Sequence, residues 1–575
     1  MRGLALTAVL LLVAACPKPA PLETATCGDW LQWGAGPAHV GGSCVAAQPP
    51  ARKVAELVSD PFAAAEKAEN DGELTAHYQA PLALGDDVYI EVKAGDYVAC
   101  RPPGSGTPEP CGVNSAGTLR WTEQRLHWDG DALTPAWSFP TDWQPAPTAW
   151  EAVFQPALAG DYLVVPGAGG TVFQVGRGDG VAVRRVNPFG ADVDATIYVS
   201  SALAADARGN VWYTALQLDP ADPWRRDATG WLVRVAPDGT FASATFTSLT
   251  PGAPAAGDAC VRQFSKAVTP RPWPPPDGAD GKPTLPPSGP CGSQRPGVNA
   301  APAIGADGTV FVVSRAHFSS RYSYVVAVRP DLTPSWATSL RDLVADGCGV
   351  LVPQDDSDTG CRKGSAVGVD PLTNQRPALR VDDTSSASPV ALPDGGVVYG
   401  ALTLYNDFRG HLVKLGAAGA YLGAYDFGWD TTPAVRAHDG TYSIVTKDNH
   451  YVYDAMGVPQ GPYYLTQLSK DLLPEWKFQA TNTESCAEDA AGALACTSDH
   501  PHGFEWCINA PALDASGVLY ANSEDGRLYA VGPDGAERGH LFLHLALGAA
   551  YTPLALDRAG RIYAQNDGRV FVLGR

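Results

Sequence analysis

Short apolar runs separated by glycine turns recur along most of the chain, and residues 509–575 carry the pattern with the fewest interruptions. Each unit of this stretch begins with a small residue and a proline, followed by a short apolar run, an aspartate and a glycine turn. An apolar run centred on an aromatic residue comes next, and an Asp-Gly pair separates it from a further apolar run. The unit occurs twice at a spacing of about forty residues, which is typical of propeller blades built from short strands. The pattern therefore predicts an all-β fold.

Units of the same kind extend back to about residue 79. Each begins with small residues, usually a proline and then an apolar residue, and continues with a glycine turn that permits the positive φ of a tight hairpin. Eight units can be recognised, beginning at Ala80, Gln155, Ser200, Ala301, Ser388, Thr432, Ala510 and Thr552. We therefore predict a single eight-bladed β-propeller of four-stranded antiparallel blades over residues 76–575, with seven blades as the alternative.

The last apolar run ends at Gly574, which leaves the final blade one outer strand short. A segment between Cys27 and residue 60 is expected to supply that strand, because closing the ring removes exposed strand edges. Residues 60–69 predict a short helix, since Asp60 can cap it and Pro61 suits its first turn. Residues 27–75 are thus expected to pack on the ring or close it.

Residues 1–15 have the features of a signal peptide, with a positive start and a short apolar core. Val13-Ala14-Ala15-Cys16 resembles a bacterial lipobox, in which Cys16 would receive lipid. An ordinary secretory signal with a chance cysteine is the alternative. Residues 16–26 are then expected to form the lipidated cysteine and a flexible tether. By resemblance to enterobacterial sorting, an aspartate after the cysteine would retain the protein in the inner membrane; Pro17 stands there instead, which favours the outer membrane.

The chain has 12 cysteines, and an exported protein enters an oxidising compartment in which disulfides form. Metal binding by these thiols is the weaker alternative, since no CxxC pair is present. The spacing indicates local pairs, with one cysteine of the final trio left over: Cys27 with Cys44, Cys100 with Cys111, Cys260 with Cys291, Cys348 with Cys361, and the trio Cys486, Cys496 and Cys507.

Three cysteine-containing insertions interrupt the repeat, at residues 251–297, 341–383 and 480–508. Blade cores do not accommodate inserts of this length, so we expect them on a face or rim of the ring. Long loops on a rigid scaffold often carry function, although they can equally be shields or decoration.

The net charge of −20 and the isoelectric point near 4.9 argue against binding to nucleic acid or to an anionic membrane surface, which the field of the protein would repel. Two sequence motifs indicate which class of β-propeller this is. They are residues 29–43, DWLQWGAGPAHVGGS, and residues 327–336, AVRPDLTPSW.

Both segments resemble motifs of the pyrroloquinoline-quinone-type, or quinoprotein alcohol dehydrogenase-like, β-propeller repeats. The resemblance implies that Trp336 locks adjacent blades and that Trp30 and Trp33 pack against the closing blades. Trp121, Trp137 and Trp476 look like degenerate copies of the same tryptophan. The uneven conservation of the signature within the chain indicates a diverged relative.

The residues that precede each inner strand should ring one mouth of the central channel. They are polar and could hold a small ligand by hydrogen bonds, or they could cap strand starts and bind water. The candidate ligand-binding residues are Gln155, Ser200, Asn299, Asp382, Asp383, Ser385, Asp430, Thr431, Asn509 and Tyr551.

The resemblance also implies an alternative function, as an oxidoreductase that uses pyrroloquinoline quinone with calcium. The sequence has no Cys-Cys dipeptide and no matching calcium-ligand set or catalytic aspartate, and Asp382-Asp383 is the one acidic pair near the mouth. Asp355–Gly360 lacks the later glutamate of a calcium loop. His500 and His502 could bind a metal, but they lie in an exposed type of loop. We therefore assign no catalytic residue, metal or cofactor.

The leading hypothesis is a lipid-anchored propeller of the bacterial cell envelope that acts as a scaffold for protein interactions and not as an enzyme. In anchor and fold it resembles the propeller lipoprotein of the outer-membrane-protein assembly machinery. Its expected partners are the membrane, through Cys16, and a protein of unknown identity. A surface carbohydrate-binding protein is a further alternative, suggested by 15 tryptophans and the export signal.

Overall fold

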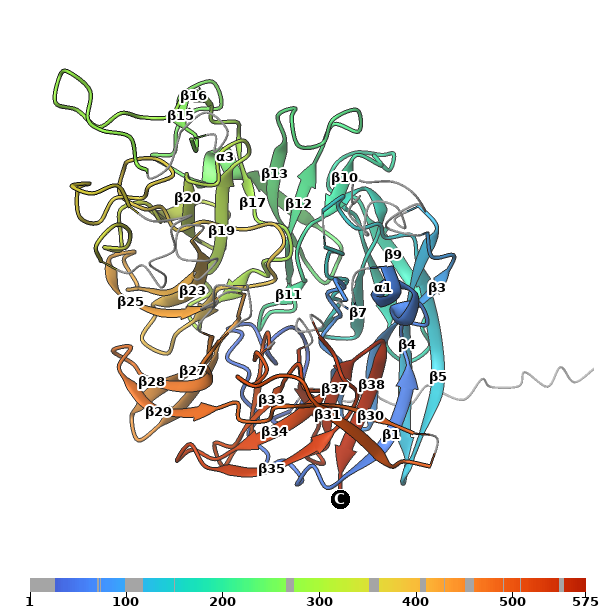
Figure 1. The fold of residues 1–575 in the computed structure, drawn as a ribbon. Coiled ribbons are helices and arrows are strands. Elements are labelled where there is room, and N and C mark those ends of the chain that lie inside the picture. The colour runs from blue at the N-terminus through green and yellow to red at the C-terminus, as the bar shows by residue number, and fades with distance from the viewer. Residues whose placement is uncertain are drawn as a thin grey trace, which may run out of the picture.

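A computed structural model describes residues 26–575 except 70, 71, 73, 99–116, 149, 265–272, 351–360, 404–409, 429, 450–459, 490, 507 and 548–552. In the described part of the chain, eight antiparallel sheets follow one another around a common centre (Figure 1). The prediction of an all-β, eight-bladed propeller is confirmed, and the seven-blade alternative is wrong. No described helix is long and apolar enough to cross a membrane.

Each blade begins at the axis and ends at the rim. The first four blades are β2 (Leu82–Leu84), β3 (Asp87–Gly95), β4 (Leu119–Asp129) and β5 (Ala132–Thr141); β6 (Ala157–Ala159), β7 (Tyr162–Pro166), β8 (Val172–Gly176) and β9 (Ala182–Val186); β10 (Ile197–Val199) with β11 (Ala204–Ala205), β12 (Val211–Gln217), β13 (Thr229–Val235) and β14 (Phe241–Thr245); and β17 (Gln294–Pro296) with β18 (Ala303–Ile304), β19 (Val310–Ala316), β20 (Ser323–Val328) and β21 (Pro334–Ser339).

The remaining four blades repeat this order. They are β22 (Val390–Ala391), β23 (Val397–Leu402), β24 (Gly410–Leu415) and β25 (Tyr421–Gly428); β26 (Ala434–His438), β27 (Thr441–Asn449), β28 (Tyr463–Ser469) and β29 (Pro474–Gln479); β32 (Ala512–Leu513), β33 (Leu519–Asn522), β34 (Arg527–Val531) and β35 (Glu537–Phe542); and β36 (Ala555–Leu556), β37 (Ile562–Asn566), β38 (Arg569–Gly574) and β1 (Arg52–Val58).

The eighth blade joins the two ends of the chain. Strand β1 pairs antiparallel with β38, from Arg52 opposite Gly574 to Val58 opposite Arg569, and so supplies the outer strand that the C-terminal repeat lacks. Figure 1 shows β1, in blue, beside the red strand β38. This strand from the N-terminal segment thus covers the edge of β38 and becomes the outer strand of the eighth blade.

Residues 30–48, here called the N-terminal belt, cross one face of the ring before β1 begins. Their backbone or side chains form hydrogen bonds with each blade in turn; for example, Leu158 N–H donates to Leu31 O at 2.9 Å and Val435 N–H to Val40 O at 2.8 Å. The belt thus contacts all eight blades in chain order, through Ala83, Leu158, Ala205, Ile304, Ala391, Val435, Leu513 and Gly560.

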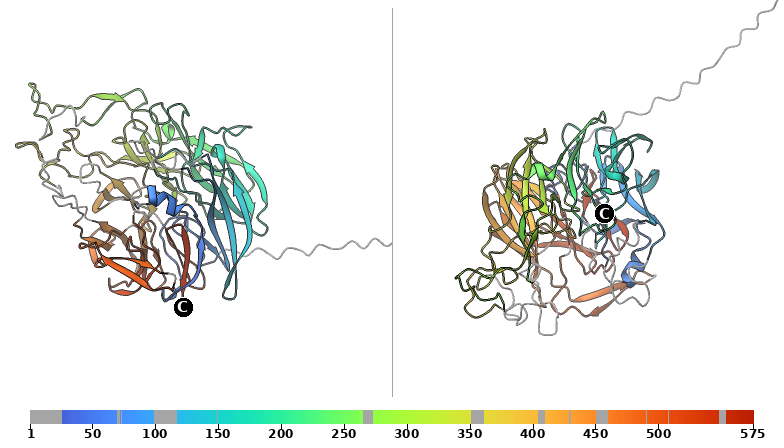
Figure 2. Two further views of the ribbon diagram at one scale, coloured as in Figure 1. Left: turned by 45° about the vertical axis from the view of Figure 1, so that its right-hand side comes forward. Right: turned by 90° about the horizontal axis from the view of Figure 1, so that it is seen from above.

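The belt divides the surface into two unlike faces. Its partners lie next to the short turns that join the first two strands of each blade, so we call this side the turn face. In an antiparallel sheet, the connections between second and third strands and between blades lie on the other side, the loop face. All three insertions are connections between blades, so they extend from the loop face (Figure 2).

The loop face carries the remaining elements. Helix α1 (Ala63–Glu69) packs Ala63 against Leu74, Tyr78 and Ala546, and Asp60 Oδ1 accepts the Phe62 N–H ahead of it, as expected of a capping residue. The connection between β7 and β8 contains the 3₁₀ turn η1 (Ala168–Gly170), and α3 (Phe246–Leu249) directly precedes the first insertion. The insertions themselves add two hairpins, β15 (Ala259–Val261) with β16 (Ser288–Pro290) and β30 (Glu484–Glu488) with β31 (Leu494–Ser498).

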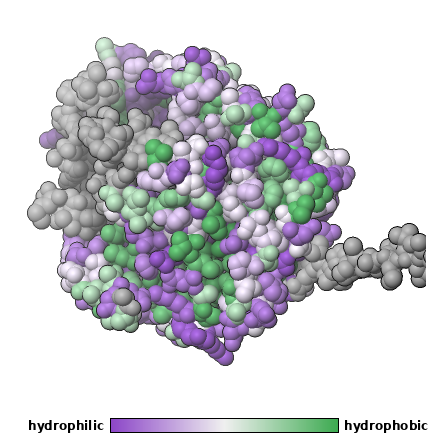
Figure 3. Space-filling view, turned by 90° about the vertical axis from the view of Figure 1, so that its right-hand side faces the viewer, coloured by the Kyte–Doolittle hydropathy of each residue, from purple (hydrophilic) through white to green (hydrophobic). Residues whose placement is uncertain are grey.

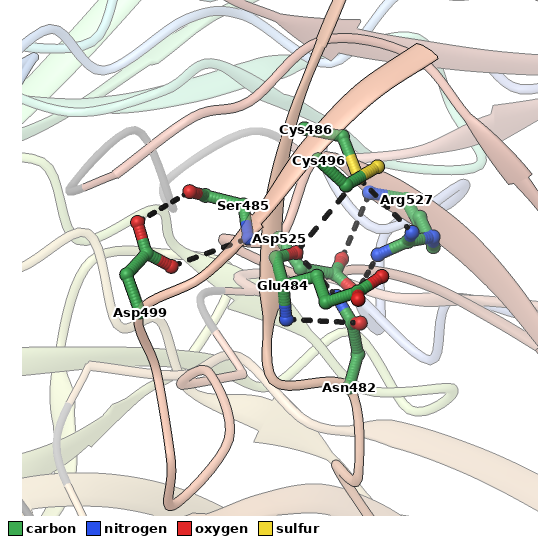
Figure 4. Close-up of a disulfide and its surroundings, with 8 residues drawn as sticks. All are labelled: Asn482, Glu484, Ser485, Cys486, Cys496, Asp499, Asp525 and Arg527. Atoms are coloured by element: carbon green, nitrogen blue, oxygen red, sulfur yellow. Dashed lines mark hydrogen bonds and ion pairs between the residues drawn. A yellow bond between two sulfur atoms is a disulfide. The ribbon is translucent and has the colours of Figure 1, made fainter.

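Three predicted disulfides are present, Cys27–Cys44, Cys260–Cys291 and Cys348–Cys361, and within the predicted trio Cys486 pairs with Cys496. The last of these links β30 to β31, and Arg527 of blade seven donates to Cys486 Sγ at 3.6 Å (Figure 4). Asn482 Nδ2 also donates to Asp525 Oδ2 at 3.0 Å, so the base of the hairpin is fixed to blade seven. Cys16, Cys100, Cys111 and Cys507 lie outside the described residues.

Tryptophans at the outer strands join neighbouring blades, as the family resemblance implies for Trp336. Trp336 Nε1 donates to Ala417 O at 2.8 Å, and its ring lies over Gly419 of the next blade. Trp137 and Trp476 pack in the same way over Gly180 and Gly535. A side chain at these glycines would meet the indole at under 3.0 Å, which explains why the turns need glycine.

Trp121 was predicted to be another copy of this tryptophan, and that prediction is wrong. It lies on β4, fully buried, with its ring 4.9 Å from that of Trp143 in an edge-on arrangement. The prediction failed there because the sequence near a tryptophan does not show whether its indole packs within its own blade or against the next one.

Candidate functional site

The channel centre is filled by a side chain of the belt. Trp33 is 1% exposed and clusters with Ala80, Val153, Ala202 and Ala301, which come from four different blades. Its Nε1 also donates to Thr432 Oγ1 of a further blade at 3.4 Å. The indole therefore lies on the propeller axis, and Trp33 does not pack only against the closing blades as predicted; Trp30 does, in the cluster formed by blades one, seven and eight.

The small residues of the repeat explain this arrangement. The positions that begin each inner strand are alanines or other small residues, and they approach the axis from all sides. A larger side chain at these positions would occupy the volume of the indole, so the alanines and Trp33 form one packed unit.

Several of the predicted mouth residues connect one blade to another. Gln155 Oε1 accepts the Ala80 N–H at 2.6 Å, and Asn299 Oδ1 accepts the Val153 N–H at 2.9 Å. Asn509 Oδ1 accepts the Thr432 N–H at 2.7 Å. These side chains are buried, and each satisfies a backbone donor that faces the axis.

A second part of the mouth is a small polar cluster around Asp430. Ser385 Oγ donates to Asp430 Oδ1 at 2.7 Å, and Asn509 Nδ2 donates to the same oxygen at 3.2 Å. Asp430 adopts a φ of 53° and is 1% exposed, and burial raises its pKa to about 6. Its Oδ2 and the neighbouring Thr431 Oγ1 have no partner, so this cluster keeps two buried polar atoms that a ligand or water could reach.

The other mouth candidates are placed differently. Ser200 Oγ shares a hydrogen bond with Thr214 Oγ1 at 2.9 Å. Asp382 Oδ1 accepts from the N–H and Oγ1 of Thr384, as in a local turn. Asp383 turns away to arginines, and Tyr551 lies outside the described residues. That these residues hold a ligand stays a prediction.

The residues at the mouth do not fit the calcium and quinone that the family resemblance would imply. Asp430 is one carboxylate at the mouth. Asp383 forms ion pairs with Arg295 Nη2 at 2.7 Å and with Arg315 Nη1 at 2.8 Å. Across the described residues, no three His, Cys, Asp or Glu side chains come close enough together to hold a metal ion. Calcium needs six to eight oxygen ligands, so we derive no reaction through such a centre.

The histidine pair gives no metal site in the structure either. His500 Nδ1 bonds to Asp499 Oδ1 at 2.6 Å, and its ring stacks on Phe504 with centroids 3.8 Å apart. Asp355–Gly360 lies outside the described residues.

A buried charged cluster near blade one was not predicted. Lys93 Nζ lies 3.0 Å from Asp60 Oδ2 and 2.5 Å from Glu151 Oε1, and all three groups are nearly inaccessible. Glu91 and Glu123 lie opposite each other on β3 and β4, and burial raises the pKa of both, that of Glu123 to about 8. Asp60 and Tyr78, from the segment before β2, lie against Lys93 of β3 and so enclose its ammonium group.

Comparison with known proteins gives relatives of similar fold. No protein-family model matches the sequence, and no curated protein matches it. Among solved structures, a europium-containing methanol dehydrogenase has a TM-score of 0.49 and 11% identity, covering 93% of this chain and 89% of that one.

Two further structures extend the comparison. The quinohemoprotein alcohol dehydrogenase from Comamonas testosteroni has a TM-score of 0.49 and 10% identity over 95% of this chain and 81% of that one. BamB from Moraxella catarrhalis has a TM-score of 0.38 and 11% identity over 91% of this chain and 99% of that one. At such identities, the chain is similar to these three proteins in β-propeller fold alone.

Proposed function

We propose that the protein is an exported, lipid-anchored scaffold of the bacterial cell envelope that binds another protein through its loop face. The observation that carries this proposal is the asymmetry of the ring. The turn face is crossed by the belt and the axis is filled by Trp33, whereas every long insertion extends from the loop face.

The insertions also expose apolar side chains where a partner could bury them. Leu285, Val350, Val367 and Leu494 lie in the three insertions, and Val367 is 76% exposed. Protein interfaces commonly combine such apolar positions with a polar rim. Figure 3 shows hydrophobic residues interspersed with hydrophilic ones on one flank of the ring as well, and Val181 and Leu473 are exposed apolar residues outside the insertions.

The position of the belt suggests how an anchored protein would be oriented. Asp29 Oδ1 accepts the N–H of Gly85 at 3.0 Å, in the first turn of blade one, so the described chain begins at the turn face. The nine residues between Cys16 and Thr26 make ten Cα–Cα steps, which could span at most about 35 Å. A lipid on Cys16 would therefore keep the turn face toward the membrane and direct the loop face away from it.

Removing the β30–β31 hairpin tests the role of the loop face. Thr483 O accepts the Asp499 N–H at 3.3 Å, so an Asn-Gly turn can replace residues 484–498 without moving the flanking chain. We expect recovery of the envelope partner in affinity capture to fall at least about tenfold, which corresponds to 1.4 kcal/mol. Stability should change by about 1 kcal/mol or less, because the Lys53–Glu488 ion pair that is lost is partly exposed.

The matched control changes the turn face instead. Asp439 lies in the first turn of blade six with its side chain 96% exposed, and Asp439→Lys should leave partner recovery unchanged. Equal recovery by the trimmed protein and the wild type, or a loss caused by Asp439→Lys alone, would contradict the assignment to the loop face.

A further inference from the structure

Two adjoining cavities on the loop face are lined by arginines, in a protein whose net charge is −20. The first encloses about 240 Å³, and its walls include Arg262, Arg315, Arg321 and Arg380. The second encloses about 450 Å³ and shares Arg262, Arg315 and Phe318 with the first. No aspartate or glutamate among the described residues lines the first cavity.

These arginines come from parts of the chain that are far apart. Arg262 follows β15 in the first insertion, Arg315 lies near the end of β19, and Arg380 belongs to the second insertion. Arg321 lies in the connection between β19 and β20. The fold therefore brings together four cations that occupy separate stretches of sequence.

Acidic partners neutralise only part of this charge. Asp383 pairs with Arg315 and with Arg295, and Asp370 Oδ2 lies 3.8 Å from Arg321 Nη1. Asp382 and Asp342 contribute weaker attraction to Arg315 and Arg321. Among the described carboxylates, none forms an ion pair with Arg262 or Arg380.

Arg380 is the clearest sign of an absent partner. It is 8% exposed, its Nε has no hydrogen-bond partner, and its two terminal nitrogens face only the amide oxygen of Gln263, at 2.9 and 3.1 Å, once that amide is oriented to accept. Burial lowers the pKa of Arg380 to about 10; the nearby Asp370 opposes this shift, and Arg321 and Arg315 add to it. Asp370 is shared between Arg321 and Arg380, so one carboxylate faces two buried guanidinium groups, and an anion in the cavity would supply further negative charge.

The second cavity adds aromatic surface beside the arginines. Trp224 stacks against His317 with centroids 6.1 Å apart, and the Arg295 guanidinium lies 5.4 Å from the Trp224 ring centre. Phe318 completes this wall and is shared with the first cavity. A flat ring could pack here while a charged substituent entered the first cavity.

We propose that the two cavities form a binding site for a small molecule that carries an oxyanion group on a ring-shaped body. The guanidinium groups of Arg262, Arg315 and Arg380 hold the oxyanion, which is a phosphate, sulfate or carboxylate. The aromatic wall of Trp224 and Phe318 receives the ring. This site is separate from the channel mouth and from the hairpin used to test the scaffold proposal.

Calorimetric titration of the purified full-length protein tests the site, with inorganic phosphate, sulfate and acetate as probes at constant ionic strength. We expect saturable binding of at least one probe, and the tightest of the three identifies the oxyanion. Arg380→Gln should weaken that binding about ten- to a hundredfold, the range for a charged hydrogen bond. Phenyl phosphate should bind about two- to tenfold more tightly than inorganic phosphate, because its ring can pack on Trp224.

Two controls keep the proposal falsifiable. Arg226→Gln removes an exposed arginine that pairs with Asp219 outside the cavities, and it should leave binding unchanged. Thermal unfolding without ligand should show Arg380→Gln to be folded at the temperature of the titration, which separates lost binding from lost folding. No saturable binding of any probe, binding that Arg380→Gln leaves intact, or equal stabilisation by chloride would overturn the site. Phenyl phosphate binding no more tightly than phosphate would overturn the ring-shaped body.

Discussion

Replacing Trp33 by alanine is expected to lower the free energy of unfolding by about 3–5 kcal/mol, the range for deleting a buried tryptophan. The loss should reach the upper part of this range, because the indole contacts alanines of several blades that cannot all move inward to fill the space. Equilibrium unfolding in guanidinium chloride, followed by circular dichroism, measures the change.

Trp336→Ala provides the matched comparison. Trp336 joins two blades at the rim but is only partly buried, so its loss should cost clearly less than that of Trp33. Trp33→Phe should recover part of the lost stability, since a smaller ring still occupies the axis. Equal costs for the two alanine variants would mean that Trp33 does not hold the ring together at its centre.

The second large effect is a pH-dependent gain from Glu123→Gln. Burial raises the pKa of Glu123 from 4.5 to about 8, so the folded protein holds this carboxyl protonated at neutral pH while the unfolded chain ionises it. Below pH 4.5 the carboxyl is protonated in both states, and its contribution to the free energy of unfolding is fully present. As the pH rises from 4.5 through 8 the unfolded chain loses this proton more readily, so the free energy of unfolding falls. Glutamine keeps the hydrogen bond from Gln79 Nε2 and carries no proton to lose.

Glu123→Gln should therefore match the wild type near pH 4.5 and be more stable by about 3 kcal/mol at pH 7. Unfolding measured at intervals between pH 4.5 and 9 gives this difference directly. Glu484→Gln, on the exposed hairpin strand β30, should show no such trend. A difference for Glu123→Gln that does not change with pH would show that the carboxyl is not buried as described.

The repeat pattern was sufficient to predict the eight blades, because small residues, prolines and glycine turns recur wherever a blade begins. The disulfides could also be predicted, since the spacing of the cysteines within each insertion restricts their partners. The position of Trp336 between blades followed from the family resemblance, and its packing over Gly419 confirms that predicted contact.

Other features could not be predicted, for physical reasons. The belt does not repeat, so no periodicity indicated that Trp33 would reach the axis. Glu91 and Lys93 alternate with apolar residues as solvent-facing positions do, but both are buried, and the segment before β2 encloses the Lys93 ammonium group. Arg262 and Arg380 lie in different insertions, and only the fold shows that they share a cavity.

The sequence could not indicate how the candidate mouth residues bond, and their role in holding a ligand stays a prediction. Gln155, Asn299 and Asn509 accept backbone N–H groups across blades. These amide side chains thus stabilise the ring. The residue type alone does not show whether a buried polar side chain stabilises the fold or binds a ligand. Asp430 keeps an unpartnered carboxylate oxygen, and this side chain is buried.

The central claim is that partners bind the loop face, and site-specific photo-crosslinking in intact cells tests it most directly. A crosslinking amino acid at Val367, on the loop face, should give a discrete protein adduct, whereas the same amino acid at Asp439, on the turn face, should give none. Adducts at Asp439 without adducts at Val367, or no adduct at either position, would contradict the account.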